Sequence, residues 1–359
     1  MESEFGESRS VVGIHIATSE GRRKLATKTV ILACGGLETT RLLLVAQRTQ
    51  PHLFGGLNGP LGRYYMGHIS GKMASLALAR RSDAEYFDFF REPGRSFVRR
   101  RITFEKRTLI KHGIQNVSFW LDNPPFYDAD HRSGILSLVY LALLIPPIGR
   151  RILSEGVRIM HIGQPPYRYV AHARNVVGSP LGTASSALQI LYDRYSPALR
   201  KPGFLIRNSA GRYALHYHGE QRPNAESRVT LSNSFDALGV PRLKIDLRYS
   251  RDDVVSIIAA HSHLADALRQ SGKGRLDFWD APQDRARRVE DQASDGFHQI
   301  GTTRMSTLPE EGVTNGDCRV HGVDNLYVAS SSVFPTSGQA NPTFATVALA
   351  LRLARHLCR

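Results

Sequence analysis

The feature that most constrains the fold of this chain is a strand, a glycine turn and a helix in direct succession near its N-terminus. Residues 28–33 are apolar on both faces toward their end, which is typical of a strand buried between two layers. The strand runs into Cys34, Gly35 and Gly36, and residues 37–44 carry a helical pattern. This order predicts an α/β element, and at Gly35 the backbone can approach a ligand closely.

Strands are also predicted on both sides of this element. Residues 11–16 predict one before it, with a turn at residues 19–21 that leads back to the strand at residues 28–33. Beyond residue 70 the pattern changes to short alternating strands, at residues 72–79, 101–104, 228–231 and 243–247. A helix capped by Asp252 and Asp253 is expected to end at Gly272. We therefore predict a second, sheet-containing domain with helices beside it.

The C-terminal residues have the densest pattern. A short buried strand is predicted over residues 325–329, and the small residues Ser330 and Ser331 follow it. Asn341 in a capping position and Pro342 in the first turn predict a final helix over residues 344–357.

The first half of this final helix is apolar nearly all round, so we expect it to be buried with its N-terminus pointing into the molecule. A buried helix N-terminus offers unpaired N–H groups and attracts anions. It would suit the anionic edge of a reduced flavin, although a phosphate or carboxylate would fit the same pattern.

Composition excludes several classes of protein. With 42% apolar residues in 359, the chain has enough apolar material for one large domain or two ordinary ones. Its three cysteines are too few and too scattered for a disulfide scaffold or structural zinc, and we predict no metal site. The net charge of +15 is dispersed, and no nucleic-acid-binding motif accompanies it, so we expect no nucleic-acid partner.

No apolar run reaches the roughly 18 residues of a membrane-spanning helix. The nearest approach, residues 135–148, contains two prolines. The first residues are acidic and polar, unlike a signal peptide, so the expected compartment is the cytoplasm.

Four motifs in order resemble one family closely. They are His298-x-x-Gly301-Thr302-x-Arg304-Met305, residues 319–326, Ser332-Val333-Phe334-Pro335, and Asn341-Pro342-Thr343. This is similar to the C-terminal signature of the glucose–methanol–choline (GMC) oxidoreductases, flavoenzymes that oxidise alcohols. Residues 29–43 resemble the strand and helix of that family's flavin domain, whereas residues 75–210 show little resemblance.

The resemblance implies a two-residue active site and FAD as the cofactor. His298 matches the family's catalytic histidine, which takes the proton of the alcohol O–H while hydride passes to the flavin. Asn341 matches its partner, whose amide N–H₂ holds the alcohol oxygen; an ordinary helix cap is its alternative role. Residues expected to contact flavin are Gly35, Ser330, Ser331, Pro342 and Thr343. His68 matches a family position that is either structural or close to the flavin.

The resemblance also implies a division into domains. Residues 1–70 and 295–359 would form a partial, Rossmann-like FAD-binding domain of α/β type. Residues 71–294 would form an α+β substrate-binding domain. The substrate would be a small alcohol, with a sugar, amino-sugar or polyol hydroxyl favoured. Neither an oxidase nor a dehydrogenase is favoured over the other.

One departure from the family leaves alternatives open. The family's Gly-x-Gly-x-x-Gly turn, which cradles the pyrophosphate, does not occur in this sequence. We therefore expect the chain to represent a C-terminal part of such an enzyme and to bind FAD weakly alone. It could instead be an inactive pseudoenzyme, or a half-subunit that needs a complementing chain. A third alternative is a basic peripheral membrane-binding protein that uses residues 135–148 as its anchor.

Overall fold

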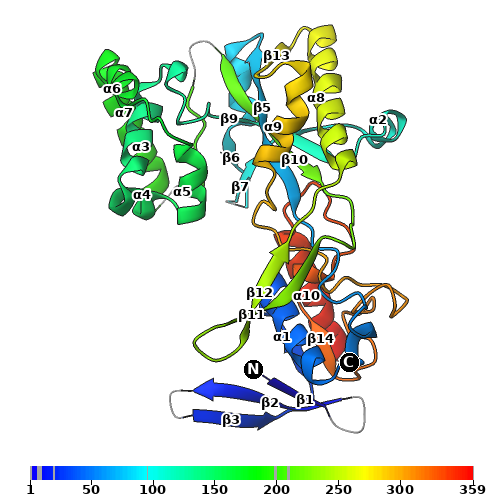
Figure 1. The fold of residues 1–359 in the computed structure, drawn as a ribbon. Coiled ribbons are helices and arrows are strands. Elements are labelled where there is room, and N and C mark those ends of the chain that lie inside the picture. Colours follow the sequence, from blue (N-terminus) through cyan, green and yellow to red (C-terminus); the bar gives the residue numbers. More distant parts are fainter. Residues whose placement is uncertain are drawn as a thin grey trace.

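The computed structural model describes residues 2–5, 10–18, 21–94, 96–197, 200–207 and 211–358. Figure 1 shows two bodies, one above the other, with a group of helices beside the upper one. The turn predicted at residues 19–21 lies largely outside the described residues, because only Gly21 is included.

The lower body is built on a pair of parallel strands. β4 (Val30–Leu32) pairs with β14 (Leu326–Val328), so the two predicted strands from opposite ends of the chain share one layer. α1 (Gly36–Thr49) follows β4, and η1 (Leu53–Gly55) and η5 (Ser331–Val333) lie in the connections. The core of this body joins residues from both ends of the chain, among them Val30, Leu43, Val320, Val328 and Val333.

Two further β elements lie in the lower body (Figure 1). β1 (Glu2–Phe5), β2 (Val11–Thr18) and β3 (Gly21–Ala26) form an antiparallel sheet. The sequence interpretation was wrong in pairing β2 with the strand at residues 28–33. It missed β3, whose side chains are all exposed and therefore show no apolar alternation.

The hairpin of β11 (Arg228–Phe235) and β12 (Pro241–Asp246) also lies here, although the predicted domain limits place it in the substrate domain. It packs against α1, where the Arg41 guanidinium bonds to the Pro241 carbonyl and forms an ion pair of 2.6 Å with Asp236.

The upper body is a five-stranded antiparallel sheet with the order β13-β5-β10-β9-β8. Its strands are β5 (His68–Leu78), β8 (Ile102–Thr103), β9 (Val117–Asp122), β10 (Arg212–Glu220) and β13 (Gly274–Phe278). Its smaller elements are η2 (Arg81–Phe87), β6 (Phe89–Arg91), β7 (Phe97–Arg99), α2 (Lys106–His112) and η4 (Pro282–Asp284).

Two helices cover one face of this sheet. α8 (Arg251–Ser271) and α9 (Arg285–Gln292) pack on it around a core that includes Phe119, Leu215 and Ile257. α8 ends at Gly272 in the left-handed conformation, as predicted. Its start differs, because Ser250 is the N-cap and forms a capping box with Asp253.

The helical group lies between β9 and β10 in the sequence. It contains η3 (Ala129–His131), α3 (Gly134–Leu144), α4 (Pro146–Ile152), α5 (Glu155–Ile162), α6 (Tyr169–Gly178) and α7 (Pro180–Tyr195). α3 contributes Leu136, Tyr140 and Leu143 to a small core. Within the described residues no single helix has the length and apolarity of a membrane span; α3 and α4 reach them only together, across a bend of 116°.

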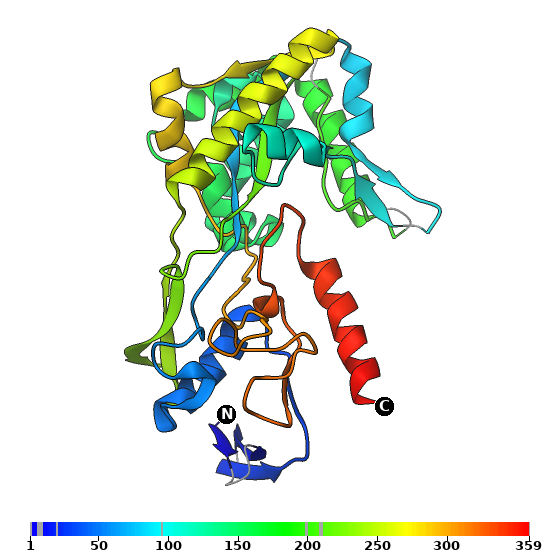
Figure 2. The same cartoon turned by 90° about the vertical axis from the view of Figure 1, so that its right-hand side faces the viewer.

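The final helix, α10 (Thr343–Leu357), stands at the edge of the lower body (Figure 2). The prediction that its first half is buried was wrong. Phe344 is 87% exposed and Val347 55%, and Leu353 is its one buried residue. The described part of the chain places no element over this apolar face, so the helix is held through its second half.

Candidate active site

Three histidines meet where the two bodies join. His68 is the first residue of β5, His218 lies in β10, and His298 lies on the connection that follows α9. The ring centroid of His68 is 4.2 Å from that of His218 and 4.8 Å from that of His298. One nitrogen of each ring lies within 4.8 Å of the other two. We call these three residues the histidine cluster.

Strand pairing explains why these rings meet. Met66 and Ile300, both fully buried, form an antiparallel bridge with two backbone hydrogen bonds of 2.9 Å. Two residues from this bridge along each segment, the amides of His68 and His298 both donate to the Asp295 carbonyl, at 3.3 and 3.1 Å, which holds the two residues beside each other. In the upper sheet, His68 pairs with the last residue of β10, so His218 is its diagonal neighbour on the same face.

Backbone carbonyls orient two of the rings. The Gly338 carbonyl lies 3.1 Å from His68 Nδ1, and the Gln339 carbonyl lies 3.3 Å from His218 Nδ1. Because a carbonyl only accepts, each Nδ1 carries the proton, and each Nε2 keeps its lone pair while the ring is neutral. Among the described residues, His68 Nε2 and His298 Nδ1 are buried without a hydrogen-bond partner.

Burial keeps the cluster uncharged. Desolvation lowers the pKa of His68 to about 4, and its neighbour His298 adds to that shift. Desolvation is also the main cause that lowers the pKa of His218 and the pKa of His298, and the positive charge of Arg101 contributes to both. At neutral pH the imidazole of His298 is therefore uncharged and able to accept a proton.

Asn341 does not cap the final helix, contrary to the alternative role expected from the sequence. Pro342 occupies the N-cap position in an α-helical conformation, and no side chain caps the helix. The Asn341 Oδ1 instead accepts a hydrogen bond of 3.0 Å from Arg101 Nη2. Since a guanidinium only donates, this bond fixes the amide orientation and leaves Nδ2 free to donate to a ligand.

Arg101 links Asn341 to the cluster. Its guanidinium lies over the Trp120 ring at 4.6 Å, and that ring meets His218 edge-on at 5.6 Å. The loop that carries Asn341 also supplies the carbonyls that hold His68 and His218. The structure thus connects Asn341 with His298 through the same small set of groups, although no direct contact joins their side chains.

Sequence reasoning missed Arg101 and His218. The alternation of His216 and His218 along a strand was a usable signal, because residues two apart share a face. Arg101 gave no signal, since it reads as one of three consecutive arginines.

Gly35 and Ser331 lie close to the residue after His298. Gly35 has φ of +80° and open space where a Cβ would stand. A Cβ on the next residue, Gly36, would lie 2.7 Å from the Gln299 carbonyl oxygen, so the start of α1 rests on that residue. The Ser331 hydroxyl donates to the same carbonyl at 2.7 Å.

The other residues expected to contact flavin fall into two groups. Ser330 is buried, and its Oγ accepts from the Ser332 amide, so its side chain serves the local turn. Pro342 and Thr343 open α10, where first-turn N–H groups lack a side-chain cap. Thr343 at the start of α10 is exposed, and the space at Gly35 before α1 is open, so each helix start leaves room for a ligand that accepts from backbone N–H groups.

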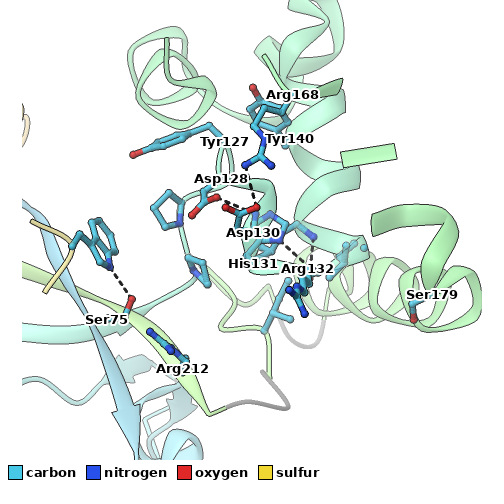
Figure 3. A pocket seen from close by; sticks show the side chains of 18 of the residues that line it. Ser75, Tyr127, Asp128, Asp130, His131, Arg132, Tyr140, Arg168, Ser179 and Arg212 are labelled. Carbon is cyan, nitrogen blue, oxygen red and sulfur yellow. Dashed lines mark hydrogen bonds and ion pairs between the residues drawn. The ribbon is translucent and has the colours of Figure 1, made fainter. Parts of the chain in front are cut away.

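A large cavity lies elsewhere, between the upper sheet and the helical group. It has a volume of about 1250 Å³ and contains none of the predicted site residues. Figure 3 shows Ser75 and Arg212 on its sheet side, with Arg132, Arg168 and Asp130 on the helical side. Its mixed charges are partly paired, as in the 3.1 Å ion pair of Arg168 with Asp130.

Comparison with known proteins shows which family the C-terminal part resembles. Residues 223–350 match the family model of the GMC oxidoreductases. The C-terminal part of the chain is therefore similar to the GMC oxidoreductases, a family of FAD-dependent flavoproteins, and the predicted resemblance is confirmed.

Individual proteins also match the chain in sequence. The chain is 24% identical over 348 residues to 2-methyl-1,2-propanediol dehydrogenase from Mycolicibacterium austroafricanum, covering 96% of this chain and 50% of that protein. It is 31% identical over 133 residues to paromamine 6'-oxidase from Streptomyces fradiae, covering 37% of this chain and 23% of that protein.

Among solved structures, pyridoxine 4-oxidase from Mesorbium loti matches 99% of this chain and 56% of its own, with a TM-score of 0.50 and 16% identity. This likeness confirms the predicted fold class. The chain spans about half the length of the diol dehydrogenase and of this oxidase.

Proposed function

We propose that this chain carries the catalytic histidine and the substrate side of an FAD-dependent oxidoreductase acting on CH–OH groups. The observation that carries the proposal is His298, an uncharged imidazole packed against His68 and beside the loop that carries Asn341. The diol and amino-sugar names of two relatives support an alcohol or sugar substrate. Within that class we propose a polyol, sugar or amino-sugar hydroxyl.

In this proposal each side chain has one task. His298 accepts the proton of the substrate O–H, and Asn341 donates its Nδ2–H to the same oxygen as negative charge develops there. Arg101 holds the amide in that orientation. FAD, when bound against Gly35 and the start of α10, supplies the acceptor for the hydride that leaves the substrate carbon. The alcohol thereby loses one proton and one hydride and becomes a carbonyl compound.

A complementing chain is a second possibility, favoured by the exposed start of α10. Phe344 and Val347 present an apolar surface beside the residues proposed to contact flavin. In this alternative, the pyrophosphate-binding part of the site is supplied by another polypeptide, and oxidation requires both.

The test is His298→Ala, assayed with added FAD and a panel of polyols and sugars by reduction of an artificial electron acceptor. We expect the rate to fall on the order of 10²–10⁴-fold, the usual contribution of a positioned base. His321→Ala is the control, because His321 bonds to the Ser306 carbonyl and lies outside the cluster. Unchanged turnover per folded molecule in His298→Ala would contradict the assignment.

The pH profile gives a second measurement on the unmutated protein. Because burial lowers the pKa of His298, its basic form persists to a lower pH than that of a free histidine. The rate should therefore rise with pH, with a midpoint below about 6.5. A midpoint above that value would mean that another group controls the rate.

A further inference from the structure

We propose that His68, His218 and His298 form a binding site for a divalent transition-metal ion such as Zn²⁺ or Co²⁺. The proposal goes beyond the proposed function, because it needs neither flavin nor alcohol. It rests on the convergence of three imidazoles from three segments of the chain, with one nitrogen of each within 4.8 Å of the others.

Hydrogen bonds identify the nitrogens of two of the rings that are able to bind a metal. The bonds of Nδ1 to the Gly338 and Gln339 carbonyls leave the Nε2 lone pairs of His68 and His218 as the available ligands. An Nδ1–H bonded to a backbone carbonyl is the usual outer support of a metal-binding histidine. Two of the three rings therefore already have the support that such a site requires.

Unpartnered atoms give a second, independent observation. His68 Nε2 and His298 Nδ1 are buried, and neither has a hydrogen-bond partner in the described part of the chain. Buried polar atoms without partners cost free energy, so an unpaired set of this kind favours a ligand that accepts lone pairs. Imidazole nitrogen suits zinc, copper, nickel and cobalt, and it does not suit calcium or magnesium.

Space for an ion exists beside Gly296. A Cβ built on that residue would lie 3.1 Å from His218 Nε2 and 3.5 Å from His298 Nδ1, so both atoms face one point that carries no side chain. Zn–N bonds of 2.0–2.1 Å in tetrahedral geometry need nitrogens about 3.3 Å apart. Side-chain rotations that bring the rings closer by about 1.5 Å would complete three of the four positions and leave one for water.

Two charged residues modify the site in opposite directions. Arg101 lies beside the cluster and repels a cation, whereas Asp295, next to Gly296, attracts one. Removal of the Arg101 charge should therefore strengthen metal binding, and this effect separates the proposed site from one formed by surface histidines.

The test titrates the purified, metal-free chain with Co²⁺ and Zn²⁺. We expect one equivalent of Co²⁺ with the visible absorption of a tetrahedral nitrogen site, displaced by Zn²⁺. His68→Gln and His218→Gln should each weaken binding by at least about tenfold, and Arg101→Gln should strengthen it. Absence of a stoichiometric site, or unchanged affinity in both histidine variants, would overturn the proposal.

His261→Gln is the matched control. His261 is fully buried, its Nδ1 bonds to the Ile257 carbonyl and its Nε2 has no partner, but its ring neighbours are Phe119, Tyr217 and Phe278. Its replacement should leave metal affinity unchanged, and an equal loss there would overturn the proposal.

His218→Cys is the variant to use if the glutamine variants do not fold. A thiolate keeps a ligand at this position, so Co²⁺ binding should persist with an added sulfur-to-cobalt charge-transfer band. Binding without that band would place the metal elsewhere. A metal bound to His298 occupies the lone pair that proton acceptance requires, so oxidation is assayed in a chelator. Oxidation there by a chain that binds no metal refutes only the metal site, and metal binding by a chain that shows no oxidation in the chelator refutes only the oxidoreductase.

Discussion

The two halves of the candidate site differ in how the chain supports them. The histidine half, with His68, His218 and His298, is built on strand pairs and is largely buried. The helix half, from Asn341 through α10, keeps one buried residue in its helix and exposes the apolar residues around its start. The chain therefore assembles the histidine cluster by itself, whereas the surface proposed to meet the flavin has no cover within the described residues.

Two substitutions on α10 should give the largest difference in stability between the buried and the exposed parts of this helix. Leu353→Ala removes the residue that anchors the helix and should lower the free energy of unfolding by about 2–5 kcal/mol. Phe344→Ala, at an exposed position of the same helix, should change it by less than about 0.5 kcal/mol. Urea unfolding of both variants measures the difference. A comparable loss in Phe344→Ala would show that the start of α10 is covered after all.

Lowering the pH should destabilise the histidine half of the site. Because the folded protein lowers the pKa of His68 to about 4, the unfolded chain binds this proton first as the pH falls. Stability should thus be full above about pH 6.5 and decline between about 6.5 and 4, by roughly 2–3 kcal/mol for this group. Urea unfolding across that range checks the slope. His68→Gln should flatten it, and an identical slope in that variant would place the acid sensitivity in other groups.

The smallest expected change in stability concerns Asn341. Since Asn341 does not cap α10, Asn341→Ala should alter the free energy of unfolding by less than about 0.5 kcal/mol, below the cost of about 1 kcal/mol for a lost cap. Alcohol oxidation should nevertheless slow by about tenfold or more, because a donor to the substrate oxygen is lost. Arg101→Gln, which frees the amide orientation, should slow the same reaction. Intact rates with lowered stability would restore the capping role.

The elements that the sequence predicts well are those defined by local pattern. The strands at residues 30–32 and 326–328 are short apolar runs that the local pattern identifies, and the split of the family's motifs between the two ends of the chain indicates that they share a layer. Gly272 ends α8 because a left-handed residue is needed there.

The predictions that were wrong concern elements whose structure depends on residues far away in the sequence. The sequence pattern shows that the first half of α10 is apolar. Whether that surface is buried depends on what packs over it, and the helical periodicity carries no information about that. β3 has the sequence GRRKLA and is exposed along its whole length. It is stabilised by pairing with β2, and this pairing is not visible in its own sequence pattern.

The histidine cluster shows the same limit for the candidate site. His298 was identified through a motif, yet its neighbours His68 and His218 lie 230 and 80 positions away in the sequence. Only the bridge between Met66 and Ile300 and the register of β5 with β10 bring these rings together. Cysteine and histidine spacing along the chain therefore gave no sign of a metal site.

Gln299 and its neighbours connect the two bodies of the molecule. The start of α1 presses on its carbonyl and Ser331 bonds to it, while the next residue, Ile300, is bonded to the strand segment that leads into the upper body. His298, which precedes Gln299, is thus tied through its neighbours to both bodies, so a change in their relative orientation would displace it less than residues far from the junction.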